Sequence, residues 1–208
     1  MDIASPAARR ANLLAAAATV ADLVARIPPD AWTGPGLGVW DLRALVGHTS
    51  RALVTVVTYL GRPAAAEEVP TPEAYFLLVA RAGGGNADAV ALRGRDAGAA
   101  LGDDPAEAFR ALVRDAAAAL EGAGDDDLIT TAAGGMRVTA YLPTRTFELA
   151  VHGADIAAAA GLPVDFTPSV LAEAATLAAR AAVALGHGPS VLAALTGRSP
   201  LPPAFSIV

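Results

Sequence analysis

Apolar positions recur every three or four residues along most of this chain, which is the period of an amphipathic α-helix. Ser5 before Pro6, Asp41, and Thr167 before Pro168 are typical helix starts, because such side-chain oxygens accept an unpaired N–H of the first turn. Proline and glycine interrupt the pattern between these segments. The sequence predicts helices over residues 6–27, 41–60, 72–100, 105–120, 143–160, 168–185 and 191–195.

Two stretches depart from the helical period. Residues 128–138 place β-branched side chains on both sides of Gly134 and Gly135, which predicts a short β-hairpin. The helix predicted over 72–100 is weakened at Gly83–Gly85. Four long helices joined by long crossings nevertheless favour a mainly all-α fold, a four-helix bundle with extra helices.

Composition excludes several classes of site. The 208 residues include no cysteine and no lysine, so all 15 cationic side chains are arginines. Without cysteine there is no disulfide framework, no thiolate zinc finger, no iron–sulfur cluster and no cysteine nucleophile. Without lysine there is no Schiff base and no phosphate-loop lysine. The net charge of −6 argues against a nucleic-acid partner.

The chain lacks the signals of membrane insertion and export. No stretch of 18 or more residues is apolar enough to span a bilayer. Arg9 and Arg10 are followed by a helical pattern rather than a short apolar segment with a cleavage site. We therefore expect a cytoplasmic protein without a membrane partner, present as a monomer or homodimer.

The helix predicted over 143–160 carries a row of polar residues. Arg145, Glu148, His152 and Asp155 fall within one arc at about 100° per residue. Glu148 and His152 are four residues apart, so a carboxylate and an imidazole stand one above the other and can bind one metal ion. The same spacing fits an ordinary solvated stripe with an ion pair, and this helix alone favours that second interpretation.

The other two histidines differ in their settings. His48 lies on the flank of the apolar face of helix 41–60, where a lone histidine is typically half-buried and hydrogen-bonded. Taken together with Glu148 and His152, it completes a His–Glu–His set that leaves a fourth coordination position open, as in catalytic zinc sites. His187 follows Gly186 at a helix end and is interpreted as a cap or loop residue.

Two segments resemble a known family. Val39-Trp40-Asp41-Leu42-Arg43-Ala44-Leu45-Val46-Gly47-His48 is similar to the "W…dL…H" segment of the mycothiol-dependent maleylpyruvate isomerase family, actinobacterial relatives of the DinB-like bundles. Residues 141–155 resemble that family's second segment, "R…E…VH…D", and residues 194–203 resemble its common tail. The resemblance implies a DinB/YfiT-like four-helix bundle, expected over residues 1–165, with a C-terminal helix and short tail packed on it over residues 166–208.

The resemblance also implies a chemistry. The family holds a divalent metal, usually zinc, at positions that correspond to His48, Glu148 and His152. It implies mycothiol as a low-molecular-weight thiol whose sulfur attacks a small electrophilic substrate, as an S-transferase or a maleylpyruvate-type isomerase. Arg145 and Asp155 would then orient the ligands, the alternative being a surface ion pair.

One departure leaves the substrate open. The isomerase carries a sizeable C-terminal domain, whereas here residues 161–208 hold one long helix and a tail. The family's acid-binding arginine has no secure counterpart, although Arg81 and Arg93 lie in the corresponding third region. The alternatives are a non-catalytic DinB-like binding or stress-response bundle and a metal-dependent hydrolase that uses a bound water.

Overall fold

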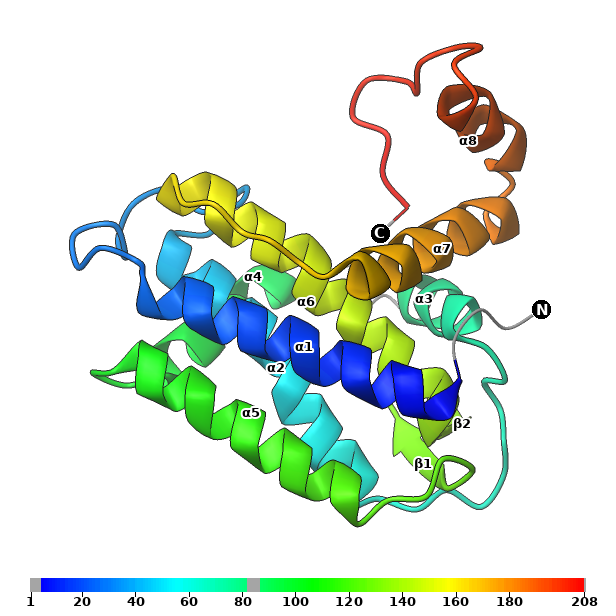
Figure 1. The fold of residues 1–208 in the computed structure, drawn as a ribbon, viewed down its shortest axis with the longest axis horizontal. Helices are drawn as coiled ribbons and strands as arrows, with labels where there is room; N and C mark the ends of the chain where they lie inside the picture. The colour runs from blue at the N-terminus through cyan, green and yellow to red at the C-terminus, as the bar shows by residue number, and fades with distance from the viewer. Residues whose placement is uncertain (1–4, 82–86, 208) are drawn as a thin grey trace.

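The computed structural model describes residues 5–81 and 87–207 (Figure 1). Its helices and strands are α1 (Pro6–Ala25), α2 (Leu42–Leu60), α3 (Pro72–Arg81), α4 (Ala87–Ala100), α5 (Pro105–Glu121), β1 (Leu128–Thr131), β2 (Gly134–Arg137), α6 (Val138–Ala160), α7 (Pro168–Ala184) and α8 (Gly188–Leu195). The helix predicted over 72–100 is thus described as two helices, and the weakening predicted at Gly83–Gly85 lies outside the described residues. The mainly helical fold with a single small hairpin in the described ranges confirms the predicted fold class.

Helices α1, α2, α5 and α6 close a four-helix bundle, because α1 and α2 each pack against both α5 and α6. Helix α4 lies along α2 on its other side, and the two backbones approach closely. A Cβ atom on Gly47 would lie 2.1 Å from the Gly98 nitrogen, so this crossing requires a residue without a side chain. The core between the helices is filled by buried aliphatic and aromatic side chains, among them Leu13, Val20, Leu45, Leu53, Phe109, Leu149 and Ile156.

Helix α6 begins at Val138, five residues before the predicted start at Pro143. The Val138 N–H donates to the Asp127 carbonyl at 2.9 Å, which satisfies a donor of the first turn. Pro143 has no N–H, so the Thr139 carbonyl lacks its donor within the helix. The guanidinium of Arg9 donates to that carbonyl at 2.7 Å instead, and the proline is accommodated inside the helix.

The hairpin predicted over 128–138 is confirmed as an antiparallel β1–β2 pair. Its turn lies at residues 132–133, and Gly134 and Gly135 belong to β2 rather than to the turn. A Cβ atom on Gly135 would lie 1.9 Å from the Ala66 carbonyl oxygen. The Gly135 carbonyl accepts the N–H groups of Glu68 and Val69, so these glycines allow the 64–69 loop to pack against the strand.

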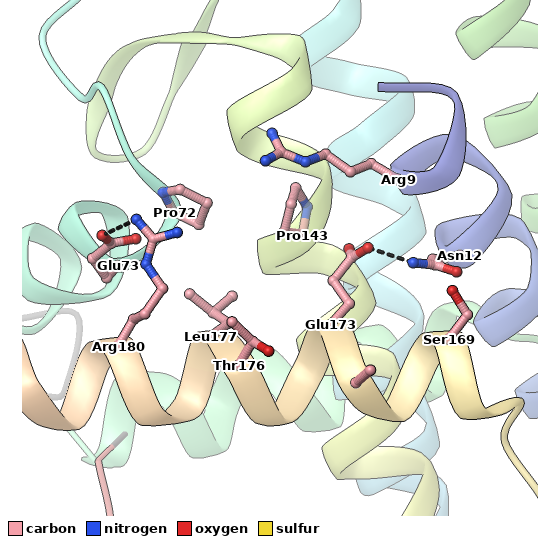
Figure 2. A pocket seen from close by; sticks show the side chains of 11 residues that line it. Arg9, Asn12, Pro72, Glu73, Pro143, Ser169, Glu173, Thr176, Leu177 and Arg180 are labelled. Atoms are coloured by element: carbon pink, nitrogen blue, oxygen red, sulfur yellow. Dashed lines mark hydrogen bonds and ion pairs between the residues drawn. The ribbon is translucent and has the colours of Figure 1, made fainter. Parts of the chain in front are cut away.

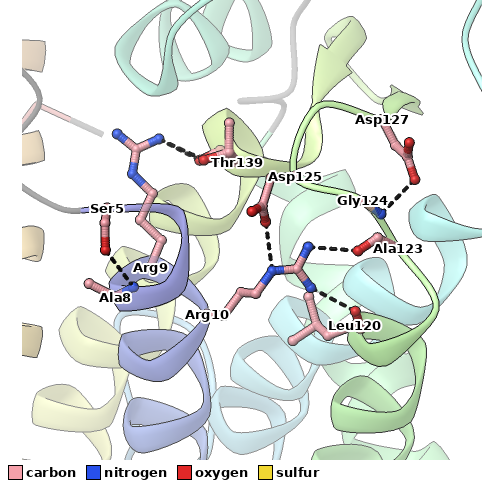
Figure 3. A network of polar contacts seen from close by, with 10 residues as sticks. All are labelled: Ser5, Ala8, Arg9, Arg10, Leu120, Ala123, Gly124, Asp125, Asp127 and Thr139. Carbon is pink, nitrogen blue, oxygen red and sulfur yellow. Dashed lines mark hydrogen bonds and ion pairs between the residues drawn. The ribbon is translucent and has the colours of Figure 1, made fainter.

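Two adjacent arginines near the start of α1, Arg9 and Arg10, connect this helix to the start of α6 and to the end of α5 (Figure 3). Arg9 reaches Thr139 at the start of α6, as described above. Arg10 donates to the carbonyls of Leu120 and Ala123 at the end of α5 and pairs with Asp125 at 2.7 Å. A cation at a helix C-terminus satisfies carbonyls that have no partner within the helix.

Helix α7 packs against α6, α3 and α1, and α8 packs against α7. In Figure 1, α8 lies at the far end of α7, apart from the bundle, and none of its residues is buried. The division into residues 1–165 and 166–208 stays a prediction. No helix in the described ranges combines the length and the apolar character that crossing a bilayer requires.

Candidate metal centre

The candidate site lies on the seam between α2 and α6, which run antiparallel. At one end of the seam, the His48 and His152 rings meet edge to face with centroids 4.9 Å apart. At the other end, the Tyr141 hydroxyl donates to Thr55 Oγ1 at 2.8 Å. Glu148 lies between these ends, one turn of α6 before His152. Two helices distant in sequence therefore bring the three predicted ligands together.

The ligand atoms of His48, Glu148 and His152 all lie within 4.8 Å of one another, so the group could hold a metal ion. His152 Nε2 is 3.3 Å from Glu148 Oε2. Their side chains keep 16% and 23% exposure, so the cluster is half-buried and not sealed. Trp40 covers the His48 ring at 4.5 Å between centroids and is fixed by its indole N–H, which donates to the Ala91 carbonyl of α4.

The two histidines differ in charge. Burial, reinforced by the nearby His152, lowers the pKa of His48 to about 4 and outweighs the attraction of Glu148, so His48 is neutral at pH 7. Its Nδ1 atom is buried and has no hydrogen-bond partner among the described residues. Burial would also lower the pKa of His152, but hydrogen bonds to Asp155 and Glu148 raise it to about 9.

Glu148 and Asp155 both act on His152. Burial alone would raise the pKa of Glu148, but the hydrogen bond from His152 and the charge of Arg145 hold it below its usual range. Asp155 Oδ2 lies 3.0 Å from His152 Nδ1. This contact fixes the orientation of the ring, with Nε2 directed at Glu148, in the manner of carboxylates that support metal-binding histidines. The expectation that Asp155 orients a ligand is therefore supported by its geometry.

Arg145 is buried rather than part of a surface ion pair, and within the described residues it forms no hydrogen bond or ion pair with the candidate ligands. It is 7% exposed, and its Nε donates to Thr144 Oγ1 at 3.0 Å. Its Cζ lies 5.1 Å from the ring centroids of both Tyr75 and Tyr141. The helical spacing placed Arg145 on the same arc as the ligands, but Tyr75 comes from α3 and no pattern in α6 indicates it.

The remaining predicted residues lie elsewhere. His187 is exposed at the α7–α8 junction, where its N–H donates to the Ala182 carbonyl and its ring meets Phe205 at 5.3 Å. It is the cap or loop residue that the sequence predicted. Arg93 is exposed on α4, and the side chain of Arg81 lies outside the described residues.

Two hollows accompany the site. One, of about 590 Å³, lies between α2, α4 and α5 and is lined by alanines together with Arg51, Arg93 and Asp96. Arg51 is one turn along α2 from His48. The other, of about 100 Å³, lies between α7 and helices α1, α3 and α6, and Figure 2 shows the Arg180–Glu73 ion pair on its wall. Neither hollow is lined by His48, Glu148 or His152.

Comparison with known proteins places the chain in a family. No curated protein and no solved structure matches it. Residues 13–157 match the family described as mycothiol maleylpyruvate isomerase N-terminal domain, and this span includes His48, Glu148 and His152. The match covers more than half of the chain and agrees with the mainly helical, DinB-like fold. The chain therefore belongs to the mycothiol maleylpyruvate isomerase N-terminal domain family.

Proposed function

We propose that this protein is a metal-dependent enzyme that uses a low-molecular-weight thiol, mycothiol, to attack a small electrophilic substrate. It acts as an S-transferase or as a maleylpyruvate-type isomerase. The observation that carries the proposal is the convergence of His48, Glu148 and His152 within 4.8 Å on a half-buried seam. The membership in a family named for a mycothiol enzyme supports the choice of thiol.

The donor set fits a divalent cation. His48 is held neutral by burial, so a ring nitrogen offers a lone pair at neutral pH, and its Nδ1 has no partner among the described residues. Glu148 is ionised and His152 is oriented by Asp155. Two imidazoles and one carboxylate suit zinc, and three protein ligands leave a position for a further group.

The protein residues would have distinct roles in the reaction. A bound divalent cation lowers the pKa of a thiol, so that thiolate is available at neutral pH. Asp155 keeps the His152 ring in the orientation that faces Glu148. Trp40 shields the His48 ring from water on one side. The chain contains no cysteine, so the reacting sulfur comes from the added thiol.

The two reaction types differ in the fate of the carbon–sulfur bond. In both, the thiolate sulfur forms a bond to the electrophilic carbon of a conjugated double bond, and the electron pair moves to the activating group. A transferase retains the C–S bond, and the adduct takes a proton from solvent. An isomerase permits rotation about the former double bond and then expels the thiolate, so that the thiol is regenerated.

Metal analysis tests the first part of this proposal. We expect purified wild-type protein to hold stoichiometric zinc, and the H152A variant to lose it. The matched control is H187A, because His187 is exposed and lies outside the cluster. Wild-type protein without stoichiometric metal after zinc loading would refute the enzyme proposal and favour a non-catalytic bundle.

Turnover tests the second part. With mycothiol and maleylpyruvate or a reactive electrophile, we expect thiol adduct or isomerised product from wild-type protein and H187A, and neither from H152A. Hydrolysis of a substrate that needs zinc but no thiol would instead assign the open position to water and refute the thiol chemistry.

A further inference from the structure

Arg145 is a buried cation beside the candidate metal centre. It lies on α6 three residues before Glu148, which corresponds to a rise of about 4.5 Å along the helix. The residue is 7% exposed, and a guanidinium stays charged in such surroundings. Burial of a charge is costly unless the charge is paired and hydrogen-bonded. The groups that contact this guanidinium therefore indicate its role.

The protein supplies Arg145 with little compensation. Its Nε donates to Thr144 Oγ1, and two tyrosine rings contribute cation–π contacts. Within residues 5–81 and 87–207, no carboxylate forms an ion pair with Arg145, and its two terminal nitrogens make no hydrogen bond. Glu148 acts on it through charge at longer range.

The two tyrosine rings lie on one side of the guanidinium. The centroids of Tyr75 and Tyr141 are 5.9 Å apart, and each is 5.1 Å from Arg145 Cζ. Three points at these distances place both rings on the same side of Cζ. In the described part of the chain, the fully buried side-chain nitrogen without a partner is Nδ1 of His48, so the terminal nitrogens of Arg145 are not sealed from solvent.

We propose that Arg145 is a specificity-determining residue that binds the carboxylate of the electrophilic substrate through its two terminal nitrogens. The fork of a guanidinium matches a carboxylate in a bidentate pair, and such a pair is strong where aromatic walls exclude water. The side chain of Arg145 leans toward the N-terminus of α6, away from His152. The anionic end of the substrate therefore lies beyond Glu148 on the Tyr141 side, and its reactive carbon lies toward the histidines. This assignment rests on the proposed function for the identity of the ligand as a substrate.

The large hollow offers a competing position. Arg51 and Arg93 line it, but Asp96 lines the same hollow and supplies a carboxylate of its own. The rings around Arg145 supply no negative group, because burial raises the pKa values of Tyr75 and Tyr141 and keeps both hydroxyls protonated. Arg145 is therefore the stronger site for an anion.

Calorimetric titration with maleate, a small unsaturated dicarboxylate, tests the proposal on zinc-loaded and metal-free protein. We expect wild-type protein to bind maleate, R145Q to bind about tenfold more weakly or not at all, and R145K to fall between them because it keeps the charge without the fork. R51Q and R62Q should bind as wild type does; Arg62 is exposed at the end of α2. Zinc content should be unchanged in R145K and R145Q.

The outcomes separate this inference from the proposed function. Maleate binding that is lost in R51Q and kept in R145K and R145Q overturns it, as does wild-type protein that binds no maleate in either form. If R145Q fails to fold, R145K still decides, because wild-type affinity in R145K refutes a need for the fork. Binding that depends on Arg145 in a protein that takes up no zinc supports the anion site while it refutes the metal-dependent enzyme.

Discussion

Metal binding at His152 should be strongly coupled to pH, because the metal has to displace a proton. Hydrogen bonds that Asp155 and Glu148 accept from His152 outweigh burial and raise its pKa to about 9. At pH 7 the neutral form is therefore about one part in 100, which weakens metal binding about 100-fold, or about 2.7 kcal/mol, relative to the deprotonated site. Below pH 9 each further unit of acid costs about another factor of ten.

The other two ligands contribute no proton over the same range. The pKa of His48 is lowered to about 4 and that of Glu148 is also lowered, so both are deprotonated at pH 6 to 8. Competition with a chromophoric chelator of known affinity should therefore give zinc affinities that rise about tenfold per pH unit between pH 6 and 8. Calorimetry in buffers of different ionisation enthalpy should give one proton released per zinc.

The D155N variant provides the internal check. It removes the hydrogen bond that raises the pKa of His152 most, so the pKa moves toward its ordinary value near 6.5. The pH dependence above pH 7 should then weaken, although zinc still binds. Wild-type affinity that is flat between pH 6 and 8, or that changes 100-fold per unit, would refute this reasoning.

The stability of the fold should respond to two substitutions and to pH. G47A should destabilise the fold by about 1–3 kcal/mol in urea unfolding, because its Cβ would lie 2.1 Å from the Gly98 backbone. The control variant G61A should not destabilise the fold, because its Cβ would meet nothing closer than 3.8 Å. Equal stability of the two variants would contradict the close α2–α4 crossing. Y141F should cost about 1 kcal/mol, because it removes the hydrogen bond to Thr55, and an unchanged melting temperature would contradict a net contribution of this bond to stability. The raised pKa of His152 stabilises the metal-free protein fully below about pH 6.5, and this contribution is lost as the pH rises through 9, so stability that increases between pH 7 and 10 would contradict it.

Features that depend on neighbours in sequence were predictable. The helix starts at Ser5, Asp41 and Thr167 were predicted from residue type, and each side chain accepts the expected N–H of its first turn. The position of Glu148 and His152 on the same side of their helix follows from helical spacing in the same way. The convergence of His48 on this pair needed the bundle, which the helix pattern predicted, and the family resemblance then implied the same three ligands.

Features that depend on distant partners were not predictable from the local pattern. Pro143 has the properties of a helix start, but Arg9, which lies more than 100 residues earlier, satisfies the carbonyl that the proline leaves without a donor. The burial of Arg145 likewise depends on Tyr75 from α3. In both cases an arginine contacts a residue of another helix, and the residue pattern of its own helix does not predict that contact.

Helix α8 has a consequence for hydrogen-exchange experiments. Because none of its residues is buried, its amides should exchange through local opening, at a free energy well below that of global unfolding. The buried amides of the α2–α6 seam should exchange through global unfolding, so zinc that binds the native state slows them in proportion to its occupancy. The amides of α8 therefore serve as an internal reference. In one sample, zinc binding should slow amide exchange at the α2–α6 seam and leave the exchange rates in α8 unchanged.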